Sequence, residues 1–138
     1  MVFLLLTVFA SMTLAADYRE VTDEQEIKSY FSDKTLKGIE IESGNEWTEY
    51  YDPKGKVCYQ FGDTYAAGRW AVDDSQVCFV YHDGEEFLCY AVLERKGLYY
   101  MKYTTGPNSG QVGFVVTQRL DGNSDFLGLD AACRGGGT

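Results

Sequence analysis

The chain has 138 residues, enough for a single domain, and its 21 acidic against 12 basic side chains give a formal net charge of −9. An acidic surface of this kind argues against nucleic acid and anionic lipid as partners. It is compatible with a basic protein as partner, but acidity is also a common means of keeping a protein soluble, so the partner stays open between a basic protein and a small ligand.

The chain opens with an apolar run from Val2 to Leu14, followed by Ala15, Ala16 and then a charged segment. This pattern resembles a secretory signal peptide over residues 1–16, and it predicts export to the periplasm or the medium. A retained membrane anchor is the alternative, but a run of about 13 residues is shorter than the ~20 needed to cross a bilayer. Because no other segment of the sequence is long enough, we expect no stable membrane span after cleavage.

Residues 17–34 are expected to form an N-terminal helical segment. Thr22 as N-cap and Gln25 three residues later make a capping box, and the acidic residues beside them favour a helix start at the same place. Three side chains then share one face at helical spacing and suit a helix that covers one end of a barrel: Ile27, Tyr30 and Phe31.

Residues 35–120 contain eight strand-length segments separated by turn signals. The first is TLKGIEIE, and seven more follow between Trp47 and Leu120. Such spacing indicates an antiparallel meander, and eight antiparallel strands can close into a barrel without unpaired edges. The predicted fold is therefore mainly β, a single eight-stranded antiparallel meander closing into a small barrel of lipocalin-like architecture, with one short helix. Residues 121–138 are typical of an irregular tail.

Turn residues set the register of the central strands. The tight turns are Pro53-Lys54-Gly55, Asp74-Ser75 and Asp83-Gly84. Traced through these turns, one face of the sheet is continuously apolar and four of its side chains are expected to anchor the core: Trp70, Phe79, Leu88 and Tyr90. An eight-stranded barrel can be filled by side chains or hold one small ligand, and the bulky aromatic residues favour filling.

Four cysteines in a small exported chain indicate two disulfides, for which three pairings exist. The hairpin register places Cys78 opposite Cys89, so this pair is preferred. It leaves Cys58 to pair with Cys133 and tie the tail to a strand. A zinc site is not expected, because the chain lacks a CxxC motif and has one histidine.

No motif for catalysis is visible. His82 is the single histidine and flanks a predicted turn, so schemes based on serine or cysteine nucleophiles lack their base. The glycine-containing loop 106–110 lacks the lysine and the following helix of a phosphate-binding loop. We therefore expect no catalytic residue and no cofactor.

Three residues are candidates for binding. Glu49 shares the inward face of its strand with Tyr51, where it could accept a hydrogen bond from a ligand or lie in water at the barrel mouth. Arg69 lies beside Trp70, and a guanidinium beside rings can bind a carboxylate or stack. The register points Arg69 outward, where an ordinary surface ion pair is the alternative.

Several short motifs follow one another along the chain: WTEYYDPKG (47–55), GRWAV (68–72), VCF (77–79), Cys89, and a closing GN…LGL (122–129). Together they resemble a group of small exported proteobacterial proteins known as a domain of unknown function. The resemblance implies a periplasmic, disulfide-bearing β-meander and carries over no catalytic residue. Cys58 and Cys133 are not part of that pattern. The Gly68-Arg69-Trp70 segment is also faintly similar to a lipocalin motif, but that motif belongs to a first strand, so no lipocalin function is transferred.

Two functions are compatible with these features. The first is a non-catalytic periplasmic or secreted binding or envelope-associated protein of unknown ligand. The alternative is an acidic proteinaceous inhibitor of a basic secreted hydrolase such as lysozyme, to which its charge would steer it.

Overall fold

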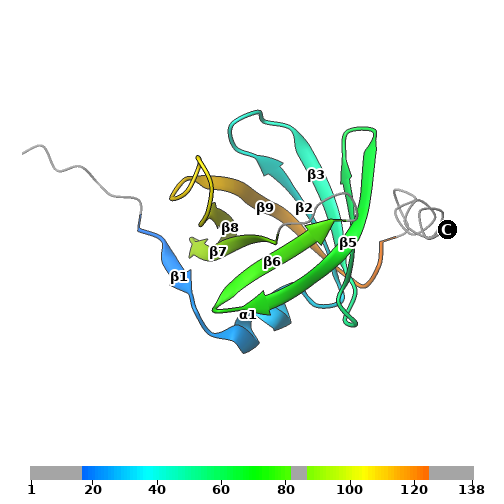
Figure 1. The fold of residues 1–138 in the computed structure, drawn as a ribbon, viewed down its shortest axis with the longest axis horizontal. Helices are drawn as coiled ribbons and strands as arrows, with labels where there is room; N and C mark the ends of the chain where they lie inside the picture. The colour runs from blue at the N-terminus through cyan, green and yellow to red at the C-terminus, as the bar shows by residue number, and fades with distance from the viewer. Residues whose placement is uncertain (1–16, 82–86, 125–138) are drawn as a thin grey trace, which may run out of the picture.

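The computed structural model describes residues 17–81 and 87–124, which form a closed antiparallel barrel with one short helix (Figure 1). From β2 to β9 each strand pairs with the next, and β9 returns to pair with β2, so eight strands close the barrel. The elements are β1 (Arg19–Val21), α1 (Glu24–Phe31), β2 (Lys34–Glu40), β3 (Glu46–Tyr51), β4 (Lys56–Phe61), β5 (Thr64–Asp73), β6 (Gln76–Tyr81), β7 (Leu88–Arg95), β8 (Leu98–Tyr103) and β9 (Val112–Asp121). The predicted fold class is confirmed.

A short strand that the sequence did not reveal, β1, completes one edge of β7. Strand β6 pairs with β7 only as far as Ala91, and β1 continues the same edge from Val92, which lies opposite Val21. Val21 is fully buried, and the Arg19 guanidinium contacts carboxylates of α1 and β7, Glu26 at 2.8 Å and Glu94 at 3.3 Å. The backbone groups of β7 beyond the end of β6 are thereby paired.

The N-cap of α1 is Asp23, so the prediction of Thr22 is wrong by one residue. The Asp23 carboxylate accepts hydrogen bonds from the backbone N–H groups of Gln25 and Glu26, at 2.8 and 3.3 Å. Aspartate is at least as good an N-cap as threonine and satisfies two otherwise unpaired donors at the helix start. The helix therefore starts one residue later than the capping box implied.

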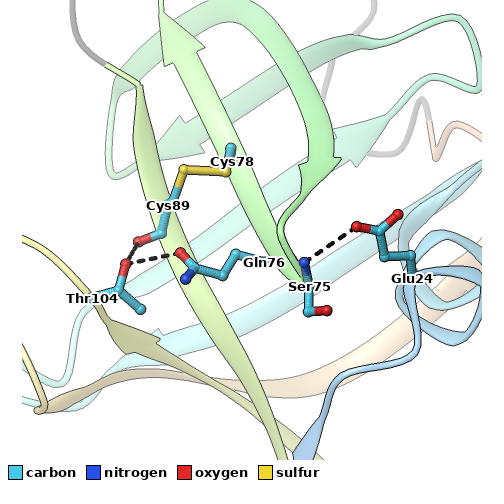
Figure 2. Close-up of a disulfide and its surroundings, with 6 residues drawn as sticks. All are labelled: Glu24, Ser75, Gln76, Cys78, Cys89 and Thr104. Atoms are coloured by element: carbon cyan, nitrogen blue, oxygen red, sulfur yellow. Dashed lines mark hydrogen bonds between the residues drawn. A yellow bond between two sulfur atoms is a disulfide. The ribbon is translucent and has the colours of Figure 1, made fainter.

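Helix α1 covers one end of the barrel, beside the β5–β6 turn (Figure 1). Ile27 and Phe31 are fully buried, and the Phe31 ring packs edge-on against Tyr51 at 5.0 Å between centroids. At the turn, the backbone N–H of Ser75 donates to Glu24 at 3.3 Å (Figure 2). This end of the barrel is closed by side chains, as the apolar face of the helix predicted.

The register predicted from the turns is present in the described strands. Tyr51 lies opposite Val57, and Val72 lies opposite Val77. Gly55 has φ +94°, and Asp74 and Ser75 have φ +48° and +58°, which are the left-handed conformations that these tight turns require. The predicted Asp83-Gly84 turn lies outside the described residues.

The same register places Cys78 opposite Cys89, and the two form a disulfide between β6 and β7 (Figure 2). Beside it, Thr104 Oγ1 lies 2.9 Å from the Cys89 carbonyl oxygen and 3.0 Å from Gln76 Oε1. Cys133 lies outside the described residues, so its pairing with Cys58 stays a prediction.

Two of the four expected core anchors are buried, Trp70 and Phe79, whereas Tyr90 is half-buried. Trp70 also donates a hydrogen bond from Nε1 to the Asp52 carbonyl oxygen at 2.9 Å. The assignment of Leu88 to the core is wrong, because its side chain is 42% exposed. Leu88 begins β7 at the end of the barrel opposite α1, where an inward-facing position lies at the rim and not in the packed interior.

Candidate functional site

The barrel interior contains a cavity of about 200 Å³ on the side away from α1. Its aliphatic lining comes from Met101 and from Leu88 at the rim, where the exposure of Leu88 marks the side on which the cavity reaches the surface. The rest of its wall is one carboxylate, Glu49, and six aromatic side chains: Trp47, Tyr59, Phe79, Tyr81, Tyr90 and Phe114. The expectation that aromatic residues fill the barrel therefore holds at the α1 end only.

Glu49 lies in this wall with 4% of its surface exposed. The Tyr51 hydroxyl donates to Oε1 at 2.7 Å, and the Tyr81 hydroxyl donates to Oε2 at 2.6 Å. Tyr51 is two residues along β3 and so faces the same side of the sheet, while Tyr81 reaches Glu49 from β6 across the interior. The alternative in which Glu49 lies in water at the barrel mouth is wrong.

The Glu49 carboxyl has a strongly perturbed acidity. Burial raises its pKa from 4.5 to about 7, and the two tyrosine hydrogen bonds oppose this shift. Among residues 17–81 and 87–124, no basic side chain contributes to the acidity of Glu49, whose pKa responds to burial and to the two tyrosine hydroxyls. Among the described residues, the ionised carboxylate is therefore a buried negative charge that two neutral hydroxyls compensate.

The tyrosines around the cavity experience the same negative field. Burial is the largest cause of the raised pKa of Tyr81, and the charge and the hydrogen bond of Glu49 raise it further. Burial likewise raises the pKa of Tyr59 and of Tyr90, and the negative charges of Glu49 and Glu40 add to both shifts. Two carboxylates therefore act on one aromatic cavity.

Trp47 is held in the cavity wall because Gly38 leaves room for its ring. A Cβ atom on Gly38 would lie 2.5 Å from Trp47 Cζ2 and would collide with the Val115 carbonyl oxygen. The indole packs edge-on against Phe114 at 6.2 Å between centroids. Its Nε1 is buried and has no hydrogen-bond partner within the described part of the chain. A water or a ligand oxygen would satisfy this donor.

The structure brings together two of the three candidate binding residues, Glu49 and Tyr51. Arg69 is exposed on the outer face of β5, between Lys56 and Val80 of the neighbouring strands, and takes no part in the cavity. Tyr81 was placed in no site from the sequence, although it ends a strand whose alternating residues Val77 and Phe79 face inward. Alternation could have assigned Tyr81 to the inner face, but not its distance to Glu49.

The described residues contain neither a metal-binding cluster nor a helix that could cross a membrane. No group of three or more histidine, cysteine or acidic side chains is arranged to hold a metal ion in residues 17–81 and 87–124. Over the same residues, α1 is too short for a membrane crossing and no other helix is long and apolar enough for one.

Comparison with protein-family models, with curated proteins and with solved structures gave no match. The chain is thus characterised as a small disulfide-bearing antiparallel barrel, and the resemblance to exported proteobacterial proteins is not extended to a family assignment.

Proposed function

We propose that this protein is a non-catalytic binding protein whose barrel holds a small organic molecule in the interior cavity. The observation that carries the proposal is the combination of an aromatic cavity with a buried carboxylate, Glu49, that has no charged partner among the described side chains. Ligand pockets are typically apolar with a few precisely placed polar groups, and this cavity has that composition.

The size of the cavity limits the ligand. Its volume of about 200 Å³ is below the roughly 300–1,000 Å³ of pockets that hold drug-sized molecules. The packed rings of Phe31, Tyr51 and Trp70 close the barrel below it. A ligand in this cavity must therefore be small, and it would lie beside Glu49.

A screen of small fragments by ligand-observed NMR tests this function. Leu88→Trp should block binding, because Leu88 lines the cavity at its rim. Leu98→Trp is the matched control, since Leu98 is equally exposed, at 44% against 42%, and does not line the cavity. Fragments that bind wild type and Leu98→Trp but not Leu88→Trp support the function. Fragments that bind all three alike, or no fragment binding at all, would refute it.

We also propose that the protein acts after export, in the periplasm or the medium. The apolar segment Val2–Leu14 and the Cys78–Cys89 disulfide support this location, because disulfides persist in oxidising compartments. Mass spectrometry of protein recovered from producing cells should show a mature start near Ala16 or Asp17. Soluble protein that retains Met1 would contradict it.

Inhibition of a basic secreted hydrolase remains the second candidate, and the net charge of −9 favours it. Activity assays of lysozymes with and without the purified protein, at low and high salt, test it directly. Inhibition that weakens as salt screens the attraction would support this alternative.

A further inference from the structure

The geometry points to a small organic cation, an aliphatic amine or a quaternary ammonium, as the class of ligand that occupies the barrel cavity. This inference rests on the proposed function and specifies its ligand. The charged group would lie next to the Glu49 carboxylate, and its carbon substituents would contact the aromatic wall.

The first argument is charge. Glu49 is 4% exposed, and its hydrogen-bond partners are two neutral hydroxyls, those of Tyr51 and Tyr81. A buried carboxylate is costly unless a positive charge compensates it, and among the described residues only neutral tyrosine hydroxyls act on Glu49. The Glu49 carboxylate would repel an anionic ligand, whereas a cationic ligand would compensate its buried charge.

The second argument is the chemistry of the wall. Faces of tyrosine, tryptophan and phenylalanine attract cations, and cages of such rings recognise quaternary ammonium groups. Six of the nine lining residues are aromatic, and only Met101 and Leu88 are aliphatic. A neutral apolar molecule would use the same wall but would leave the carboxylate with its two neutral hydroxyl partners and no positive charge beside it.

The third argument concerns the other ionisable groups that face the cavity. Tyr51 and Tyr81 bond to Glu49, and Tyr59 and Tyr90 carry pKa values raised by burial and by the charges of Glu49 and Glu40. All four tyrosines therefore stay neutral well above neutral pH, as the raised pKa values of Tyr51 and Tyr81 also require. Binding of a permanent cation should then follow the ionisation of the carboxylates, above all that of Glu49.

Choline and its neutral isostere 3,3-dimethyl-1-butanol make the decisive probe pair, because they share a shape and differ in charge. Binding is measured by ligand-observed NMR and calorimetry in sodium phosphate, which contains no competing amine. We expect choline to bind about tenfold or more tightly than the alcohol to the wild-type protein. Because choline is charged at every pH, its affinity should fall as the pH drops below about 7 and Glu49 becomes protonated, until choline binds no more tightly than the alcohol.

Glu49→Gln keeps the size of the side chain and removes its charge, so it should abolish both the preference for choline and the pH dependence. Glu46→Gln is the matched control on the same strand, because Glu46 is exposed. It should bind like wild type. If Glu49→Gln does not fold, the comparison of choline with the alcohol on wild type still decides the inference.

The possible outcomes distinguish failure of the cation inference from failure of the proposed binding function. Equal affinity for the two probes, or tighter binding of the alcohol, overturns the cation inference while the binding function stands. Absence of choline binding overturns it as well, and the Leu88→Trp fragment screen then shows whether the cavity binds anything. A choline preference that survives in Glu49→Gln would place the cation site elsewhere and overturn the assignment.

Discussion

Replacing Glu49 by glutamine should change how the stability of the ligand-free barrel depends on pH. Burial raises the Glu49 pKa from 4.5 to about 7 in the folded protein. Between these values the folded state binds a proton that the unfolded state has released, so stability is greatest below pH 4.5 and falls as the pH rises through 7. A pKa difference of this size corresponds to about 3 kcal/mol of unfolding free energy, at 1.36 kcal/mol per pH unit.

Urea denaturation followed by tryptophan fluorescence measures the effect in sodium phosphate and acetate buffers. The wild type should lose about 3 kcal/mol of unfolding free energy between pH 4.5 and pH 8 beyond any change in Glu49→Gln. The two proteins should therefore diverge most at high pH, where the wild type buries an ionised carboxylate and the variant a neutral amide. Glu46→Gln controls for the general relief of repulsion in a chain of net charge −9.

Parallel pH profiles for wild type and Glu49→Gln would refute this reasoning. They would mean that the hydrogen bonds from Tyr51 and Tyr81 compensate the buried charge fully, and that Glu49 needs no cation. A profile that rises with pH in wild type alone would mean that these bonds outweigh burial.

Three further changes test the scaffold. Trp70→Ala should lower the unfolding free energy by about 3–5 kcal/mol, because it leaves a cavity at a packed site. Trp70→Phe should lower it by only about 1 kcal/mol, because it removes the hydrogen bond to the Asp52 carbonyl oxygen and keeps an aromatic ring. Urea denaturation of both variants measures these losses, and equal losses would contradict the prediction. Removing the Cys78–Cys89 disulfide by double alanine substitution should cost about 2–4 kcal/mol for a loop with a sequence separation of 11, measured by the same titration without reductant; an unchanged midpoint would show that this crosslink constrains nothing. Gly38→Ala should cost about 1–3 kcal/mol and shift the Trp47 fluorescence, since the new Cβ would collide with the ring and with the Val115 carbonyl oxygen; a variant with wild-type emission and stability would disprove that close contact.

Local sequence signals determined the eight strands of the barrel, the turns between its central strands and therefore their register. A tight turn fixes which residues face each other, so Asp74-Ser75 placed Val72 opposite Val77, and strand alternation then assigned each side chain to one face. The same logic paired Cys78 with Cys89, because their approach depends on one local hairpin.

Only the tertiary structure decided how deep an inward-facing residue lies along the barrel axis. Leu88 and Phe79 face each other on the same surface, yet Leu88 is 42% exposed at the rim and Phe79 is 3% exposed. Strand β1 also could not be predicted from local sequence, because it pairs with β7, more than 70 residues further along the chain.

The candidate site likewise depends on the tertiary structure of the barrel. Alternation placed Glu49 and Tyr51 on the inner face, but the bond from Tyr81 joins residues 32 positions apart and forms only when the sheet curls into a closed barrel. Depth within that barrel sets the burial of Glu49, and burial sets its pKa. The sequence by itself therefore determined which side chains face inward, and closure of the barrel decided which of them meet, because strand order, tilt and shear are properties of the whole sheet.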